Sequence, residues 1–286
     1  MGNKIPISDS TRESLLNPHT ALTHTFKELQ NLGGGVSGIV TLVEDLDGRR
    51  LAIKKCHGFS RLLEMFKGEN SDSEGEETIE QKESARGLFD ELGVSKVGLS
   101  EFNKSLTLNH PTIVKIYTLF LKVFNQEVTT NLLMEYIEGS ELIRIKDGTL
   151  SREHALKALN HILSALIHLI ERGIVPTDLH GGNIIVTQES CRMVDIEGHE
   201  TLEEAEKGGS SDSNLEHRLK EVWGLVQDFI RKGIFSQQDK IIFYKYKSDF
   251  HSKESVKVHL NEVTNRKNIF ILREFIEGFL QLTSNL

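Results

Sequence analysis

The sequence has few cysteines, no long apolar run and no excess of positive charge. Its two cysteines, Cys56 and Cys191, are too few for a disulfide framework and lack the spacing of a zinc site, so we expect a reducing, cytoplasmic compartment. No apolar run approaches the ~18 residues of a membrane-spanning helix. The formal net charge of −8 argues against a protein that binds nucleic acid by neutralising its phosphates.

The composition is otherwise that of a soluble globular protein. Of the 286 residues, 38% are hydrophobic and 27% are charged, and the length allows one large domain or two small lobes. Residues 1–24 are polar and irregular, so we expect an N-terminal extension there. This stretch lacks the apolar core of a secretory signal, and Pro6 occupies the position where a myristoylation motif has serine or threonine.

Residues 67–84 form an acidic segment with seven acidic and two basic side chains and almost no apolar content. Such a segment buries too little apolar surface to order itself, so the sequence predicts a disordered insertion. Ser71 and Ser73 each have a glutamate three residues later, which is the pattern that acidophilic kinases phosphorylate. A solvated loop without modification is the alternative.

Three strands are predicted between Phe26 and Lys55, with a hairpin turn at Asp47-Gly48. Between the first two strands lies LGGGVSGIV, a glycine-rich segment whose backbone can approach phosphate groups because it has few Cβ atoms. A dinucleotide-binding loop would continue into a helix, whereas GIVTLVED reads as a strand. The segment is therefore either a phosphate-covering loop between two strands or a flexible turn.

A long helix is predicted after Ser151, a candidate N-cap, because apolar residues recur every three or four positions up to Ile170. Arg172-Gly173 would end this helix. A second amphipathic helix is predicted at the C-terminal end, from about Leu272 to Leu280.

The stretch from Gly173 to Gly198 carries Asp178, Asn183 and Asp195, separated by five and then twelve residues. An acid can accept the proton of a hydroxyl group, and an amide and a second acid can hold Mg²⁺ against phosphates. Chance often produces an aspartate and an asparagine at this spacing. The rest of the chain therefore has to supply a nucleotide site in the right order.

These segments together resemble the protein-kinase-like superfamily. GIVPTDLHGGNIIV resembles the catalytic loop H-R-D-L-x-x-x-x-N, and Asp195 begins DIE where that family has D-F-G. LGGGVSGIV fits G-x-G-x-x-G-x-V, and LAIKK places Lys54 where V-A-I-K has its phosphate-binding lysine. NHPTIVKIY resembles the segment H-P-N-I-V-K-L, and Glu101, ten residues before Pro111, is in register with the glutamate that pairs with this lysine. Outside this context, Glu101 would be interpreted as a solvated helix residue.

The resemblance implies an ATP site and a magnesium site. LLMEYIEGSEL resembles a kinase hinge, in which Met134 would be the gatekeeper and Glu135 and Ile137 would present backbone groups to adenine. The implied ATP-binding residues are Leu32, Gly33, Gly34, Gly35, Val36, Ser37, Gly38, Val40, Ala52, Lys54, Met134, Glu135, Ile137 and Ile185. The implied catalytic residues are Asp178, Lys54, Glu101 and His180, and the implied Mg²⁺ ligands are Asn183 and Asp195.

Four departures accompany the resemblance. Pro176 and Thr177 replace the His and Arg of H-R-D, and His180 stands where protein kinases have lysine. DIE replaces D-F-G, and no A-P-E follows. The pattern D-L-H-x-G-N is similar to aminoglycoside and choline phosphotransferases. Residues 218–230 resemble the central helix of the large lobe, with Glu221 at the usual aspartate position.

The implied fold is α+β and bilobal, like that of compact, atypical kinases, among them minimal kinases that bacterial pathogens deliver into host cells. A small, mainly-β N-lobe would span residues 25–137, and a reduced helical C-lobe would span residues 138–286. The implied partners are a protein substrate and an activating partner, with no nucleic acid and no membrane span.

Three functions remain open at this point. The hinge and NHPTIVKIY favour a protein serine/threonine kinase, whereas DLHGGN and the missing A-P-E also allow a kinase for a small molecule. The loss of H-R and D-F-G allows a pseudokinase or interaction module. Against that third reading, all five residues that carry the phosphoryl-transfer chemistry are present: Lys54, Glu101, Asp178, Asn183 and Asp195.

Overall fold

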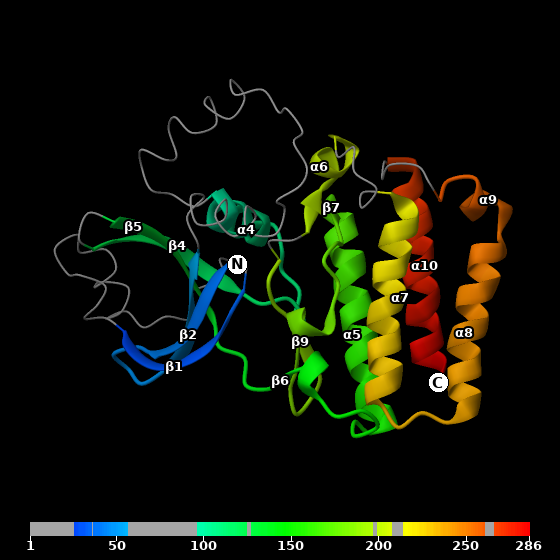
Figure 1. The fold of residues 1–286 in the computed structure, drawn as a ribbon, viewed down its shortest axis with the longest axis horizontal. Helices are drawn as coiled ribbons and strands as arrows, with labels where there is room; N and C mark the ends of the chain where they lie inside the picture. Colours follow the sequence, from blue (N-terminus) through cyan, green and yellow to red (C-terminus); the bar gives the residue numbers. More distant parts are fainter. Residues whose placement is uncertain are drawn as a thin grey trace, which may run out of the picture. The chain divides into compact units, whose positions relative to one another are not determined.

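The computed structural model describes residues 26–35, 37–56, 96–124, 127–196, 199–207, 214–260 and 266–286. Its contacts divide the chain into two compact units. The first comprises Met1–Leu106 and Lys115–Tyr136, and the second comprises Thr107–Val114 and Ile137–Leu286. The described part of the first unit is mainly β structure and that of the second is mainly helical (Figure 1). The α+β class expected from the sequence is therefore confirmed.

The first unit is built on one antiparallel sheet with the strand order β1-β2-β3-β5-β4. Its strands are β1 (Lys27–Gly34), β2 (Gly38–Glu44), β3 (Arg50–Cys56), β4 (Ile116–Phe124) and β5 (Glu127–Glu135). Helix α4 (Lys96–Leu106) contacts β4 and β5. The three strands expected at the start of this unit are confirmed, and a strand follows the glycine-rich loop as expected.

The turn between β2 and β3 is fixed by the side chain of Asp45. Its Oδ1 accepts hydrogen bonds from the backbone N–H groups of Asp47 and Arg49, over 2.9 and 2.8 Å. Gly48 has a φ of 77°, which suits a residue without a Cβ atom. This turn confirms the predicted hairpin and sets the register of β2 against β3.

The strand register gives the two faces of this sheet different roles. Residues directly opposite one another on antiparallel strands point to the same face. The register pairs Val40 with Lys54 and Ala52 with Met134, so these four side chains share one face. The opposite face carries an apolar cluster. It consists of Phe26, Val43, Leu51 and Leu133, with Ile53, Tyr117 and Phe120 packed against them.

Helix α5 (Arg152–Glu171) in the second unit has one strongly buried face, as its apolar spacing predicts. The side chain of Ser151 caps its N-terminus by accepting a hydrogen bond from the N–H of His154 over 3.1 Å. Gly173, with a φ of 71°, follows its C-terminus. The buried residues of this helix are Ala155, Leu156, Ala158, Leu159, Ile162, Leu163, Ala165, Leu166 and Leu169.

The second unit also contains α7 (Leu215–Lys232), α8 (Gln237–Ser252), α9 (Glu254–Lys257) and α10 (Arg266–Asn285). Helix α10 packs against α5, α7 and α8, and Figure 1 shows these helices side by side. Aromatic rings fill the space between α8 and α10, with Phe279 lying 4.7 Å from Tyr246 and 4.9 Å from Phe275 between ring centroids. The C-terminal helix and the helix through residues 218–230 are both confirmed, and both are longer than expected.

Short elements build the stretch that carries the three chemically interesting side chains. Strands β6 (Ser140–Glu141), β8 (Ile184–Val186) and β9 (Cys191–Met193) form one small sheet, and β7 (Ile174–Val175) pairs with β10 (Glu200–Thr201). Two 3₁₀ turns, η2 (Leu142–Arg144) and η3 (Gly181–Asn183), and the short helix α6 (Leu202–Lys207) complete the unit. The sequence did not indicate β10 or α6, because their region is acidic and rich in glycine and serine.

Some expectations lie outside the described residues. These are the N-terminal extension over residues 1–24, the acidic insertion over residues 67–84, and the position of Val36. Among the helices that the structure describes, none combines the length and hydropathy that a bilayer crossing requires.

Candidate active site

Lys54 and Glu101 form an ion pair inside the first unit. The Nζ atom of Lys54 on β3 lies 2.8 Å from Oε2 of Glu101 on α4, and the two residues are 4% and 0% exposed. Buried charges need a partner, since removal of one leaves the other desolvated at a cost of about 3–5 kcal/mol. The ion pair that the resemblance implied is therefore present, and it fixes the lysine on the sheet face that also carries Val40, Ala52 and Met134.

The glycine-rich loop is a tight connection between β1 and β2. The N–H of Gly35 donates to the carbonyl oxygen of Gly38 over 2.9 Å, and Gly33 lies opposite Val40 in the strand register. A Cβ atom at Gly38 would lie 2.4 Å from the carbonyl oxygen of Lys55, so only glycine fits there. The structure thus explains Gly38 by its close approach to β3, independently of any nucleotide.

The remaining residues expected around the nucleotide lie in both units. In the first unit Ala52 and Met134 are buried, whereas Leu32, Ser37 and Val40 are half-buried. In the second unit Ile137 and Ile185 are also half-buried. Exposed or half-exposed backbone glycines at positions 33, 34 and 35 complete the set.

The backbone at Glu135 is already partly committed. Its N–H donates to the carbonyl oxygen of Lys115 over 2.9 Å, and its side chain accepts from the N–H of Lys115. Both contacts lie within the first unit, and the adenine contact that the resemblance implies for the backbone of Glu135 stays a prediction.

Asp178 and Asp195 share an unusual backbone conformation in the second unit. In the described part of the chain they are the only non-glycine residues with positive φ, at 53° and 58°. A left-handed conformation costs an L-residue roughly 1–2 kcal/mol, although aspartate tolerates it better than most. Such strain is typically kept at functional sites. The two acids implied for proton acceptance and metal binding are thus the two positions where this part of the chain retains it.

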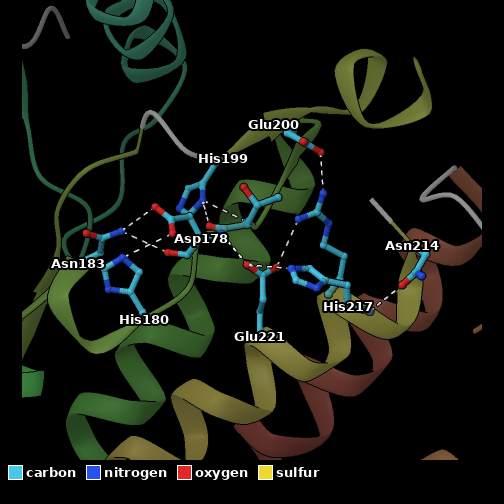
Figure 2. A network of polar contacts seen from close by, with 10 residues as sticks. Asp178, His180, Asn183, His199, Glu200, Asn214, His217 and Glu221 are labelled. Atoms are coloured by element: carbon cyan, nitrogen blue, oxygen red, sulfur yellow. Dashed lines mark hydrogen bonds and ion pairs between the residues drawn. The ribbon is translucent and has the colours of Figure 1, made fainter. Parts of the chain in front are cut away.

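Asn183 and His180 surround the side chain of Asp178 (Figure 2). The Nδ2 of Asn183 donates to the carbonyl oxygen of Asp178 over 3.2 Å and to its Oδ2 over 3.3 Å. The Nδ1 of His180 accepts from the N–H of Gly182 over 3.1 Å, which places the proton of the neutral ring on Nε2. That Nε2 lies 3.5 Å from Oδ1 of Asp178, so His180 turns its N–H toward the acid.

Glu221 on α7 is hydrogen-bonded to the backbone of Asp178. The N–H of Asp178 donates to Oε1 of Glu221 over 2.7 Å. Burial raises the pKa of Glu221, while the charges of Arg218 and His217 and the Asp178 N–H act in the opposite direction. The sequence placed Glu221 at the position of the usual aspartate, and the structure shows it in contact with the loop that carries Asp178.

Three polar residues near the loop were missed by sequence reasoning. Arg218, 4% exposed, bridges Glu221 over 3.3 Å and Glu200 of β10 over 2.8 Å. His199, 2% exposed, contacts the backbone of Thr177 through Nδ1, at 3.2 Å from its nitrogen and 2.6 Å from its oxygen. The spacing of three residues between Arg218 and Glu221 on one helix was the only available signal.

Asn183 and Asp195 suit magnesium rather than a metal held by many protein ligands. No cluster of three or more His, Cys, Asp or Glu side chains with metal-binding geometry occurs within the described residues. Mg²⁺ is commonly held by one or two carboxylates together with waters and substrate phosphates. Because Nδ2 of Asn183 points to Asp178, its Oδ1 is the atom left to face an ion. The donor set therefore fits Mg²⁺.

Comparison with known protein families gives a match in the middle of the chain. Residues 77–214 match the protein kinase domain family, from before α4 to the N-cap of α7. The glycine-rich loop and Lys54 precede this match, so they depend on their own motifs and on the geometry described above.

The individual proteins that the chain resembles are also protein kinases. The chain is 24% identical over 189 residues to the serine/threonine-protein kinase cds1 of Schizosaccharomyces pombe. These residues make up 65% of this chain and 35% of that protein. It is 30% identical over 107 residues to human calcium/calmodulin-dependent protein kinase type IV. The aligned residues make up 37% of this chain and 22% of that protein. It is 29% identical over 104 residues to the serine/threonine-protein kinase PknG of Mycolicibacterium smegmatis, covering 35% and 13%.

The matches span less than half the length of these relatives. Glu101 and the loop that carries Asp178, Asn183 and Asp195 lie within the residues that match the family. The comparisons therefore support the resemblance of this chain to the protein-kinase-like superfamily.

Proposed function

We propose that this protein transfers the γ-phosphate of ATP, with Mg²⁺, to a serine or threonine hydroxyl of a protein substrate. The observation that carries the proposal is the conformation of Asp178 and Asp195. Both acids adopt positive φ, and Asn183 is hydrogen-bonded to the first of them. A fold maintained only for packing has no need to keep two strained acids at these positions.

Asp178 would orient the hydroxyl group of the substrate and accept its proton. Its side chain is exposed, so a substrate can reach it, and its contacts with Asn183 and His180 limit its orientation. Asn183 and Asp195 would hold Mg²⁺, which when bound neutralises charge on the phosphates. The catalytic gain of such an arrangement comes from placing these groups before the reaction begins.

Lys54 would bind the α- and β-phosphates. Its contact with Glu101 holds the buried ammonium group in place. The glycine-rich loop would cover the γ-phosphate with backbone N–H groups. Val40 and Ala52, on the same sheet face as Lys54, would contribute to the apolar slot for the adenine ring.

A small-molecule acceptor is the second candidate, and one observation favours it. His180, in the D-L-H-x-G-N pattern shared with aminoglycoside and choline phosphotransferases, directs its Nε2 to Asp178 at 3.5 Å. In that role it could assist in positioning a small hydroxyl compound. The relatives named above are serine/threonine- or calmodulin-dependent protein kinases, which supports the protein acceptor as the first choice.

The proposed setting is a reducing cytoplasm, with an activating partner protein. One experiment separates the candidates: purified protein is incubated with γ-labelled ATP, Mg²⁺ and a cell lysate that has been heated to inactivate its own kinases. Label in protein bands supports a protein kinase, and label only in small molecules supports the second candidate. If neither is labelled while ATP still binds, the protein is a pseudokinase.

A further inference from the structure

We propose that Glu200 and Arg218 are positioning residues that hold the catalytic loop in its reactive conformation by a permanent charge, without a phosphate group. This inference rests on the proposed function of Asp178. It deepens that function by stating how the site is regulated: the segment after Asp195 carries its own negative charge, so no added phosphate is needed to order it.

A continuous series of polar contacts links Glu200 to Asp178 (Figure 2). The Oε2 of Glu200 on β10 accepts from Nη2 of Arg218 on α7 over 2.8 Å. The Nη1 of Arg218 reaches Oε2 of Glu221 over 3.3 Å. The other oxygen of Glu221, Oε1, accepts the N–H of Asp178 over 2.7 Å. The guanidinium group is thus shared by two carboxylates, one of which holds the proposed proton acceptor.

Burial makes this arrangement demanding. Arg218 is 4% exposed, and a guanidinium group that cannot lose its proton must be paired when it is removed from water. Its planar fork offers separate nitrogen atoms to Glu200 and Glu221, which a single lysine ammonium could not do in the same geometry. If Glu200 loses its charge, Glu221 is the one ionic partner that Arg218 keeps among the described residues, and the geometry of that contact is free to change.

The backbone fixes Glu200 in position to make its contact. Strand β10 pairs antiparallel with β7, with Glu200 opposite Val175 and Thr201 opposite Ile174. The N–H of Leu202 adds a hydrogen bond to the carbonyl oxygen of Gly173 over 2.8 Å. The chain just after the metal-binding acid is therefore paired with the chain just before Asp178.

His199 provides a second tie at the same place. Its Nδ1 contacts the backbone nitrogen and oxygen of Thr177, the residue before Asp178. Thr177 stands where H-R-D has an arginine, which in many kinases pairs with a phosphorylated residue of the activation segment. In this chain the arginine, Arg218, comes from α7 instead of the loop before Asp178. Its anionic partner is Glu200, a residue of the segment after Asp195, and not a phosphate group.

The test compares Glu200→Gln with wild type in the full-length chain. The glutamine keeps the size of the side chain and removes its charge. We expect kcat to fall about tenfold or more, because a charge-assisted hydrogen bond is lost. The KM for ATP should stay unchanged, since Glu200 has no proposed contact with the nucleotide. Glu200→Asp, which keeps the charge, should recover part of the rate.

Glu206→Gln is the matched control. It removes the same charge from the same short segment, but Glu206 lies on α6 at 3.9 Å from Arg266 and outside the contacts that reach Asp178. Its kcat should equal that of wild type. A Glu200→Gln variant with wild-type kcat, or an equal loss in Glu206→Gln, would overturn the proposal.

A second measurement does not depend on activity. Hydrogen exchange of the peptide covering residues 174–183 should be faster in Glu200→Gln and in Arg218→Gln than in wild type, and unchanged in Glu206→Gln. Unchanged exchange in the first two variants would overturn the coupling even if the enzyme is active. If wild type transfers no phosphate at all, the proposed function fails, and the exchange rates still decide whether Glu200 positions the loop.

Discussion

Lys54 and Glu101 are joined by a 2.8 Å ion pair in which neither residue is more than 4% exposed. This burial means that the lysine supports the first unit as well as the proposed chemistry. Lys54→Met should therefore abolish phosphoryl transfer and also lower the free energy of unfolding by about 3–5 kcal/mol, because the buried carboxylate of Glu101 would lose its ion pair with Lys54. Denaturant unfolding and ATP turnover measured on the same preparation check both effects.

The double variant Lys54→Met with Glu101→Leu is the control for this prediction. Replacing both charges by apolar groups removes the desolvation penalty, so stability should return to near that of wild type while transfer stays absent. Activity in the double variant would exclude Lys54 from the mechanism. Stability as low as that of the single variant would show that the pair is not what the single substitution disrupts.

The strained backbone at Asp178 predicts two variants that are equally inactive but differ in stability. Asp178→Gly and Asp178→Ala should both abolish transfer, since both lack the carboxylate. The glycine variant should be more stable than the alanine variant by about 1 kcal/mol, because only alanine keeps a Cβ atom at a φ of 53°. Unfolding midpoints of the two variants give the comparison, and equal midpoints would contradict the assigned strain.

His180 should matter more for turnover than for nucleotide binding. Its Nε2 lies 3.5 Å from Oδ1 of Asp178, the proposed proton acceptor. His180→Ala should lower kcat by roughly tenfold with little change in ATP affinity, since the interaction gains strength in the transition state. His154→Ala is a suitable control, because the Nε2 of His154 contacts the backbone oxygen of Ser190 over 3.3 Å and not Asp178. An unchanged kcat in His180→Ala would leave it as a residue that only shapes the loop.

Two histidines of α5 and one that contacts this helix predict loss of stability in acid. Burial lowers the pKa of His110, His161 and His168, and the His110 and His168 rings lie 5.4 Å apart, so protonation of one disfavours the other. The folded state therefore binds fewer protons than the unfolded chain below the ordinary histidine pKa of about 6.5. The free energy of unfolding should fall as the pH is lowered from about 7.5 to about 5.5. A His168→Gln variant should show a shallower fall, and an identical slope would contradict this origin.

The protein should need no phosphorylation of the segment after Asp195. Thr201 uses its hydroxyl to accept the N–H of Glu204 and donates its own N–H to the Glu204 side chain, so its polar groups already cap α6. A phosphate there would also meet the carboxylates of Glu200, Glu203 and Glu204. Protein treated with phosphatase, and shown by intact mass to carry no phosphate, should keep full activity. Loss of activity that is restored by rephosphorylation at Thr201 would contradict the prediction.

Local patterns in the sequence were sufficient for most of the fold. Ser151, the apolar spacing that follows it and Gly173 determine α5 through interactions within the helix or with one buried face. The hairpin at Gly48 depends on four neighbouring residues in the same way. The pairing of Lys54 with Glu101 could be predicted because each lies in a recognisable motif, although the burial of the two side chains could not.

The features that the sequence did not reveal depend on tertiary contacts or on backbone angles. Glu200 and Arg218 are eighteen residues apart, and nothing near either one indicates that they meet. The contact of His199 with Thr177 spans twenty-two residues and needs β7 and β10 to pair first. The positive φ of Asp195 is imposed by its surroundings, since aspartate has no local requirement for it.

Transfer of the γ-phosphate by wild type and by Asp195→Ala tests the central claim most directly. Both proteins are incubated with γ-labelled ATP, Mg²⁺ and heat-inactivated lysate, and their melting temperatures are recorded in parallel. The account predicts Mg²⁺-dependent label on serine or threonine of protein substrates with wild type, and none with Asp195→Ala at an unchanged melting temperature. Equal labelling by both proteins, or none by a wild type that binds ATP, would contradict it.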